Sequence, residues 1–278
     1  MINYVNNSFD KVLKPCDAQQ FMTLTQSEQT ERLILSHRAG EKKAKIKLPA
    51  LTYMGVFDKK KYEAHLGTPS NSPSLGRTQS PRNNGTRKAE FMRPTGLLML
   101  DFDHSSNPRA IYDALFSCLA SAEVDPTSVL ALAHITPSGD GLRLVLKREK
   151  GKSIQQGQYE WFKRIQEHYE GELTFDDVCK DISRLSFAPM QREILYYNPS
   201  LLFGELPEAA DYPDGTLWGG VDTDPLRSAT PCSAALPIGS SVAQSTVLPS
   251  LGTACHLGNP LKASLRPLKE GQYTHRGE

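Results

Sequence analysis

Residues 96–104 read GLLMLDFDH, a short apolar run that ends in acidic residues. A buried strand that ends at a functional rim has this pattern. Asp101 and Asp103 stand at positions i and i+2, so on a strand both project to one face while Phe102 points into the opposite layer. The stretch therefore predicts a core strand that carries two carboxylates on one side.

The residues that follow alternate between helical and strand patterns. Asn107 and Pro108 are an N-cap and a first helical residue, and Ser153 is a second N-cap. A glycine-rich turn at 136–141 separates two strand patterns and predicts a hairpin. The predicted elements are a helix to about Ala122, strands at 129–135 and 142–147, a helix to about Tyr169, and a strand-and-turn segment at 173–187. They predict an α/β (α+β) fold.

The segments before and after this core have other sequence patterns. The alternation at 44–48 predicts a strand. Residues 67–90 are rich in Ser, Pro, Asn, Gly and Arg, a composition typical of a mobile loop. Residues 206–278 are rich in Pro, Ser and Gly without sustained periodicity and predict a linker or poorly ordered tail. We therefore expect one main domain over residues 1–205.

Charge is distributed unevenly although the net charge is only +1. Residues 1–95 hold 16 Lys and Arg against 8 Asp and Glu, so this third carries +8 and the remainder about −7. The asymmetry indicates either a polyanionic partner near the N-terminal third or a solvated basic face.

The cysteine pattern and the mean hydropathy indicate the cellular compartment of the protein. Mean hydropathy is −0.43 and no apolar run approaches the roughly 18 residues that span a bilayer. The N-terminus lacks the pattern of a secretion signal. No C-x-x-C pair occurs among the cysteines, which are Cys16, Cys118, Cys179, Cys232 and Cys255. We expect a cytoplasmic protein without a disulfide framework, a structural zinc site or a membrane partner.

The acidic pair favours a divalent metal. Mg²⁺ and Mn²⁺ prefer oxygen ligands and keep positions open for substrate phosphates, and Asp101 and Asp103 can supply such ligands together. A strand that simply ends in solvated acids is the alternative. Two-metal chemistry needs a third acid, for which Asp176, Asp177 and Asp181 are candidates.

The turn at 136–141 indicates a phosphate site. Its small residues, Gly139 and Gly141 among them, leave backbone N–H groups accessible to an anion, and Ser138 adds a hydroxyl. Arg143 can pair with phosphate in a fork geometry. The alternative is a tight hairpin whose glycines only satisfy positive φ. Arg184 is a further candidate for contact with a triphosphate or template, or else for an ion pair with a nearby aspartate. His104 and His134 are expected to be rim or packed residues rather than ligands.

Three motifs in order carry a family resemblance. They are LLMLDFDH, TPSGDGLRLVL and FDDVCKDISRLSFAP, the last followed by Tyr197-Asn198-Pro199, and KIKLPALTYMGVFD precedes them. Over residues 40–200 the chain resembles the primase-polymerase domain of the archaeo-eukaryotic primase superfamily. It is most similar to the VirE N-terminal or prim-pol-like branch of mobile-element and phage replication proteins.

The resemblance implies an RRM-like catalytic domain, with an antiparallel-dominated sheet and helices packed behind it, and it implies a site. Asp101 and Asp103 would be the metal ligands of the first motif, and Ser138 with Arg143 would form the nucleotide-phosphate motif. The third acid maps onto Asp176, with Asp181 as a rival. Many relatives have a histidine where Arg143 stands, and arginine cannot act as a neutral imidazole.

The implied activity is that of a DNA primase or polymerase that uses Mg²⁺ or Mn²⁺ for template-directed nucleotidyl transfer. Single-stranded DNA or primer-template, nucleoside triphosphates and a helicase module are the implied partners. The alternatives are a nucleic-acid-binding module of a replication initiator with weak catalysis, and a metal-dependent nuclease. Alanine at Asp101 or Asp103 is expected to abolish incorporation and leave the thermal melt nearly unchanged, because rim carboxylates contribute little to packing.

Overall fold

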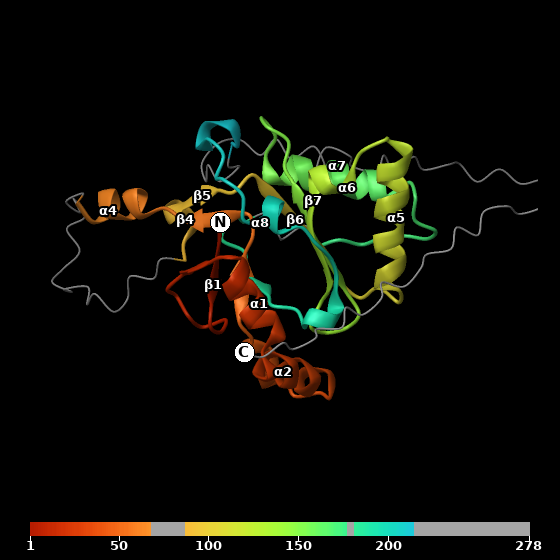
Figure 1. Ribbon diagram of the computed structural model, residues 1–278, viewed down its shortest axis with the longest axis horizontal. Coiled ribbons are helices and arrows are strands. Elements are labelled where there is room, and N and C mark those ends of the chain that lie inside the picture. Colours follow the sequence, from red (N-terminus) through yellow and green to blue (C-terminus); the bar gives the residue numbers. More distant parts are fainter. Residues whose placement is uncertain (68–86, 177–180, 214–278) are drawn as a thin grey trace, which may run out of the picture. The chain divides into compact units, whose positions relative to one another are not determined.

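The computed structural model describes residues 1–67, 87–176 and 181–213 (Figure 1). They fall in the first of two units of the chain, Met1–Val221, whereas the second, Asp222–Glu278, lies outside the described residues. Most of the predicted mobile loop at 67–90 and of the predicted tail at 206–278 also lies outside them.

The predicted core strand is the edge of a four-stranded antiparallel sheet. Its strands run in the order β10-β7-β8-β6, with α5 between β6 and β7 in the chain and α7 after β8. The bounds are β6 (Leu97–Phe102), α5 (Pro108–Ser121), β7 (Leu130–Ile135), β8 (Leu142–Lys147), α7 (Ile154–Gln166) and β10 (Ile194–Tyr197). The hairpin of β7 and β8 is confirmed, and so is the mixed α and β class with antiparallel strands.

The strand β6 is buried on both faces, and its side chains alternate between two cores. Leu98, Leu100 and Phe102 pack in the core that contains apolar residues of α5 and α7. Leu97 and Met99 pack in the core that contains residues of the N-terminal sheet. Asp101 belongs to the second face by the same alternation, so the carboxylate points away from the helices.

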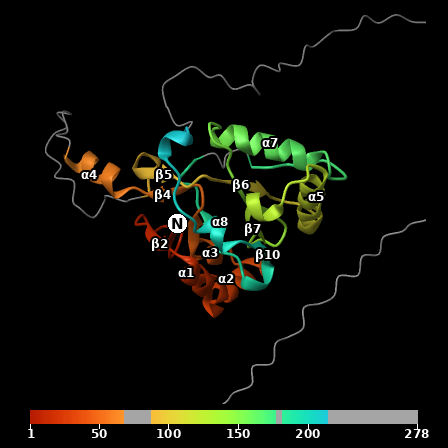
Figure 2. The ribbon, with the colours of Figure 1, turned by 45° about the horizontal axis from the view of Figure 1, so that its top comes forward.

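The second sheet was not predicted from the sequence. It has the order β2-β1-β3-β9 and is built from β1 (Ile2–Val5), β2 (Lys14–Cys16), β3 (Ala50–Thr52) and β9 (Ser186–Phe187). Figures 1 and 2 show α1 (Ala18–Gln26) and α2 (Glu28–Arg38) on the side of the molecule opposite α5 and α7. The acid-bearing face of β6 therefore looks toward this N-terminal layer.

The remaining elements are short. Figure 1 shows α4 extending from the two-stranded β4–β5 ribbon. Their bounds are β4 (Gly55–Phe57), α4 (Lys59–Gly67), β5 (Met92–Pro94), α6 (Pro126–Val129), α8 (Pro199–Leu202) and the 3₁₀ turns Ala89–Phe91, Gln191–Glu193 and Ala209–Asp211. The helix α4 ends at the first residue of the predicted loop 67–90, and the 3₁₀ turn Ala89–Phe91 begins just before the end of that loop.

The capping residues behave as predicted. The Asn107 side chain accepts a hydrogen bond from the Ala110 amide, and Ser153 and Gln156 form a reciprocal capping box. The helix that Ser153 begins ends at Gln166, three residues before the predicted end.

The strand predicted at 44–48 is wrong, because the structure has the helix α3 (Lys42–Ile46) there. Ala44 and Leu48 are both fully buried, and residues four apart lie on one face of a helical turn. The alternation of lysine with apolar residues over five positions fits a strand and a short amphipathic turn equally well, and burial of this pair favours the turn.

The folded region extends beyond the predicted boundary at residue 205. Tyr212 is 4% exposed, and the Arg148 guanidinium lies 4.8 Å from the centre of its ring. A Cβ placed on Gly96 would lie 3.1 Å from Pro207. Residues 207–212 therefore cover the start of β6.

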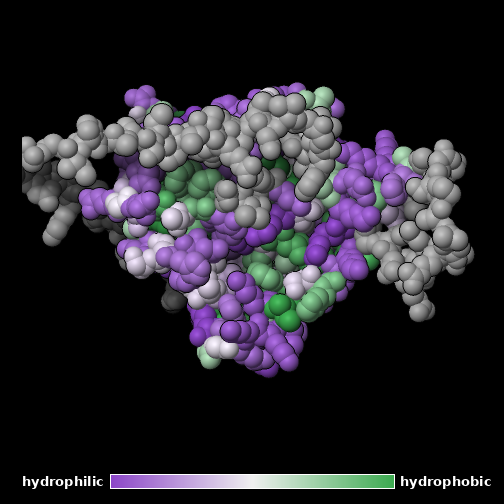
Figure 3. All heavy atoms as spheres, turned by 180° about the vertical axis from the view of Figure 1, so that it is seen from behind, coloured by the Kyte–Doolittle hydropathy of each residue, from purple (hydrophilic) through white to green (hydrophobic). Residues whose placement is uncertain are grey.

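Hydrophilic residues cover most of the visible face of the described residues (Figure 3), which fits the negative mean hydropathy. Figure 3 shows one face on which hydrophobic residues form small patches among hydrophilic ones. Within the described ranges, no helix has the length and apolar character needed to cross a membrane.

Candidate metal site and basic cleft

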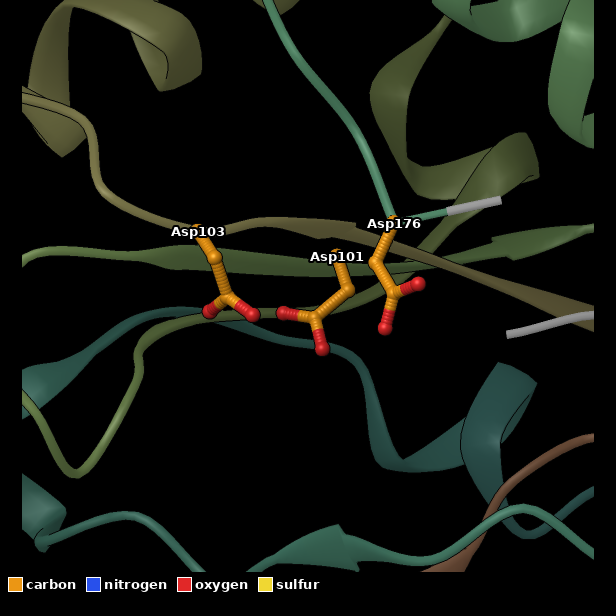
Figure 4. A group of neighbouring side chains, drawn as sticks. All are labelled: Asp101, Asp103 and Asp176. Atoms are coloured by element: carbon orange, nitrogen blue, oxygen red, sulfur yellow. The ribbon is translucent and has the colours of Figure 1, made fainter. Parts of the chain in front are cut away.

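Three aspartates meet at the end of β6 (Figure 4). One carboxylate oxygen each of Asp101, Asp103 and Asp176 lies within 4.8 Å of the other two. Asp101 is buried, Asp176 is half-buried and Asp103 is exposed. A cluster of this kind can hold a metal ion, because three oxygen ligands converge from two separate segments of the chain.

The third aspartate reaches the cluster through the free edge of β6. The Asp176 amide donates a hydrogen bond of 2.9 Å to the Asp101 carbonyl oxygen, so the segment that ends at Asp176 runs beside the strand. Leu173 is buried in the helix-side core and anchors this segment. The arrangement brings together residues 75 positions apart, as the three-acid hypothesis requires.

Of the two rival acids, Asp181 lies in the described residues and does not join the cluster. Asp181 lines the adjacent cleft, but its Oδ1 accepts hydrogen bonds from the amide and the hydroxyl of Ser183, at 2.7 and 2.9 Å. Asp177 lies outside the described residues. Of the two candidates in the described part of the chain, Asp176 is the one that lies with Asp101 and Asp103.

Arg143 stands directly opposite Asp101 on β8, and its guanidinium binds the Asp101 carboxylate. The same guanidinium donates to Ser186 Oγ at 2.7 Å. Both side chains of the ion pair are buried, at 9% and 3% exposure. Arg143 thus holds a carboxylate of the acid cluster, a role that sequence reasoning missed when it assigned this residue to phosphate.

This burial also corrects the expected effect of alanine at Asp101. Asp101 is 2% exposed and paired, so its loss would leave the buried Arg143 without its carboxylate partner. Removing one partner of a buried ion pair destabilises a fold strongly. We therefore now expect a lowered melting temperature for Asp101→Ala, and still expect a nearly unchanged one for Asp103→Ala, because Asp103 is exposed.

Arg184 forms an ion pair with Asp176, at 3.1 Å between Nη2 and Oδ2. This is the second of the two roles that the sequence allowed for Arg184. Its side chain is 40% exposed and also lines the cleft. Two of the three acids are therefore charge-compensated by arginines in this structure.

Asp103 has an unusual electrostatic setting. Although the side chain is exposed, partial desolvation of its carboxyl raises the pKa of Asp103. The neighbouring Asp101 charge raises this pKa further, while Arg143 and Lys45 act in the opposite direction. Like charges crowded at one site favour binding of a cation, because a metal ion removes the repulsion.

The turn at 136–141 is a tight hairpin tip rather than an open anion nest. The Gly139 amide donates to the Thr136 carbonyl at 2.9 Å, and Gly139 has φ of 89°. Arg38 of α2 donates to the carbonyl oxygens of Pro137 and Thr136 and forms an ion pair with Glu193. The prediction that Gly139 offers its amide to an anion is therefore wrong.

Gly141 has a packing role next to the acids. A Cβ at this position would lie 2.5 Å from Thr136 Oγ1, 2.9 Å from the Phe102 carbonyl oxygen and 3.1 Å from Asp103 Oδ1. Only glycine fits without displacing the turn or the acid. Gly141 thus allows the hairpin tip to approach the end of β6.

A cleft of about 490 Å³ adjoins the acids. Ser138 and Arg143 line it, whereas Gly139 and Gly141 are not among its lining residues. Lys45 and Arg87 add positive charge from the N-terminal third. Its full lining is Ser8, Lys45, Arg87, Asp101, Asp103, Thr136, Pro137, Ser138, Arg143, Asp181, Ser183, Arg184, Leu185 and Phe187. Sequence reasoning missed Lys45 and Arg87 individually, although the charge asymmetry pointed to their region.

The comparisons with known proteins returned no relatives. No protein-family model matches the chain, and neither a curated protein nor a solved structure matches it.

The two histidines near the site are a rim residue and a packed residue, as predicted. His104 is exposed and lies 3.2 Å from Asp140. His134 is fully buried on the strand next to Arg143, and its Nδ1 lies 2.9 Å from the Ile135 carbonyl oxygen. Because a carbonyl only accepts hydrogen bonds, the proton of the neutral ring belongs on Nδ1.

We expect His134 to make stability pH-dependent. Burial, and then the Arg143 charge, lower the pKa of His134 to about 3. Between pH 6.5 and 3 the unfolded chain therefore binds a proton that the folded chain does not, and stability falls as the pH falls through this window. The loss is about 2 kcal/mol from pH 7 to about pH 5.

Urea unfolding at both pH values checks this expectation, with His134→Leu as the comparison. The variant should lose most of the difference between the two pH values. His37, whose pKa is also lowered, remains in both proteins and contributes equally to them. An equal pH dependence in wild type and variant would contradict the assignment to His134.

Proposed function

We propose that this chain is the catalytic domain of a primase-polymerase that joins nucleotides on a DNA template, with Mg²⁺ or Mn²⁺ held by Asp101, Asp103 and Asp176. The observation that carries the proposal is the convergence of these three carboxylates, within 4.8 Å, beside a cleft lined by cationic side chains. Metal-bound oxygens next to phosphate-binding cations are the requirements of nucleoside triphosphate chemistry.

The acid cluster fits a small divalent cation. Two oxygens bound to one Mg²⁺ ion lie at most about 4.2 Å apart, since each bond is roughly 2.1 Å long. The observed limit of 4.8 Å is close to this value, so small side-chain rotations suffice. Asp101, Asp103 and Asp176 would hold such an ion, which would supply activation of the attacking hydroxyl and charge stabilisation of the pyrophosphate leaving group.

Side chains of the protein orient a metal ligand and provide positive charge for phosphates. Arg143 fixes the carboxylate of Asp101 by a buried ion pair, which keeps this ligand in one rotamer. Lys45 and Arg87 line the cleft and are suited to the phosphates of a nucleotide or template strand. Arg184 lines the same cleft, so exchange of its Asp176 contact for a phosphate is sterically accessible.

The topology is compatible with the RRM-like assignment, which is part of the proposal. The order β6-β8-β7, with α5 between β6 and β7 in the chain, is a split βαβ unit, and α7 follows β8. The segment before Asp176 occupies the other edge of β6 through its hydrogen bond to Asp101. The N-terminal sheet and the position of β10 beside β7 are additions to such a unit.

One observation favours a second candidate, a nucleic-acid-binding module with weak catalysis. Asp101 and Asp176 each bind an arginine, and metal binding has to compete with these ion pairs. A module that kept the fold and lost turnover would retain such pairs as structural contacts.

A primer-extension assay with the full chain tests the proposal. A labelled primer annealed to a longer template is incubated with deoxynucleotides or ribonucleotides and Mn²⁺ or Mg²⁺. We expect extension that stops when EDTA removes the metal. Retention of the DNA without extension would favour the binding module, and shortening of the primer would favour a nuclease.

A further inference from the structure

The loop between β1 and β2 presents an aromatic side chain to solvent. Phe9 is 70% exposed, the most exposed of the large apolar side chains in the described ranges. A single exposed apolar residue is common on protein surfaces and by itself indicates nothing. The construction of the loop and its position distinguish this one.

The loop is rigidly held on both sides of Phe9. The Phe9 amide donates to Asn7 Oδ1 at 2.9 Å, and the Asp10 carboxylate accepts from the Asn6 amide and the Asn7 side chain, at 3.0 and 3.1 Å. These bonds fix the backbone while they leave the Phe9 ring in solvent. An aromatic ring on a preformed loop loses little conformational entropy when a ligand stacks on it.

The loop is also tied to the basic wall of the cleft. The Ser8 amide and hydroxyl both donate to the Ile46 carbonyl oxygen, at 3.1 and 3.0 Å, next to Lys45 in α3. Arg87 Nη1 donates to the carbonyl oxygens of Ser8 and Asp10, at 3.0 and 3.3 Å. Ser8, Lys45 and Arg87 all line the cleft, so Phe9 lies in the loop that forms its wall.

A second aromatic residue continues this wall. Phe187 lines the cleft, and the Lys45 ammonium lies 5.7 Å from the centre of its ring. Lys11 and Lys14 follow Phe9 in the sequence and are exposed. Alternating aromatic rings and cations along a groove are the elements with which proteins bind single-stranded nucleic acids.

We propose that Phe9 is a stacking platform for a base of a single strand that enters the cleft, with Lys45 contacting a phosphate of that strand. The choice of a nucleic acid as the ligand rests on the proposed function. The inference adds a contact for the strand outside the acid cluster, and it assigns this contact to the N-terminal loop rather than to the sheet with the acids.

Equilibrium binding without metal tests the platform separately from catalysis. Full-length protein is titrated in EDTA against a fluorescently labelled single-stranded oligonucleotide, and anisotropy is followed at several salt concentrations. We expect Phe9→Ala to weaken binding by roughly 5- to 100-fold with an unchanged salt slope, because it removes stacking only. Lys45→Gln should lower the slope of log K against log salt by about 0.7, because it removes one phosphate contact.

Two further substitutions identify the kind of contact. Phe9→Trp should bind at least as tightly as wild type, whereas Phe9→Leu should be as weak as Phe9→Ala, because it keeps apolar area without a π face. Val12→Ala is the matched control, since Val12 is also exposed, at 58%, on the same connection. An oligonucleotide with 5-iodouracil should crosslink to Phe9 on irradiation, as mapped by mass spectrometry.

Unchanged affinity of Phe9→Ala, wild-type affinity of Phe9→Leu, or no binding by wild type would each overturn the inference. Binding that depends on Phe9 without nucleotide incorporation contradicts the polymerase proposal and leaves the platform intact. Incorporation by a protein whose affinity is indifferent to Phe9 contradicts the platform alone.

Discussion

The Asp103→Asn variant is expected to lose nucleotide incorporation by about 10³-fold or more and to keep its stability within about 0.5 kcal/mol of wild type. Asp103 is exposed. Partial desolvation raises the pKa of its carboxyl, and the negative charge of neighbouring Asp101 repels the carboxylate and raises this pKa further. Neutralising this carboxylate removes a metal ligand and relieves a repulsion. We therefore expect incorporation to fall while the free energy of unfolding stays nearly unchanged. Single-turnover incorporation, thermal unfolding and Mn²⁺ binding followed by electron paramagnetic resonance measure the three quantities.

Asp140→Asn is the matched control for the change in charge. Asp140 lies on the neighbouring turn, interacts with the Ser138 side chain and with exposed His104, and is outside the acid cluster. It should retain incorporation and Mn²⁺ binding. Equal activity of the Asp103 and Asp140 variants would refute the site.

A second comparison distinguishes the candidates for the third acid. Asp176→Asn should weaken Mn²⁺ binding, because its carboxylate lies in the cluster. Asp181→Asn should leave Mn²⁺ binding unchanged, because Ser183 already occupies that carboxylate and it lies outside the cluster. The reverse result would move the third ligand to Asp181.

The core of the fold could be predicted because local signals and burial agree there. GLLMLDFDH has apolar side chains for two cores, and the caps at Asn107 and Ser153 begin their helices where the side chains accept the expected hydrogen bonds. The hairpin follows from two strand patterns around a glycine-rich turn. In each case a short stretch of sequence determines its own structure.

The N-terminal sheet could not be predicted in the same way. Its strands are two to four residues long, and β9 joins β3 from a distance of more than 130 positions. Such strands have too few residues to show a period, and their stability comes from partners distant in sequence. The misassigned helix α3 lies in the same layer and has the same cause.

The residues of the candidate site also differ in how far they could be predicted from the sequence. The i, i+2 spacing placed Asp101 and Asp103 together, but only tertiary structure selects Asp176 over Asp181. The role of Arg143 required the strand register, since it is the residue opposite Asp101 on β8. Spacing along one strand is readable from a sequence, whereas register between strands is set by packing.

The Arg143→Met variant should be destabilised by about 3–5 kcal/mol, because the Asp101 carboxylate loses its guanidinium partner in a buried position. The double variant Asp101→Asn with Arg143→Met should recover much of that loss, since neither charge then remains. Urea unfolding of wild type, both single variants and the double variant gives the coupling energy directly.

The size of this coupling decides what Arg143 does. A coupling of several kcal/mol means that the arginine holds Asp101 in place and is unavailable to a triphosphate without loss of folding. A coupling near zero, with Arg143→Met as stable as wild type, would contradict the buried ion pair and return Arg143 to the phosphate role. Because Asp101 also belongs to the acid cluster, saturating Mn²⁺ should stabilise wild type and not the double variant, which ties the ion pair and the metal to the same carboxylate.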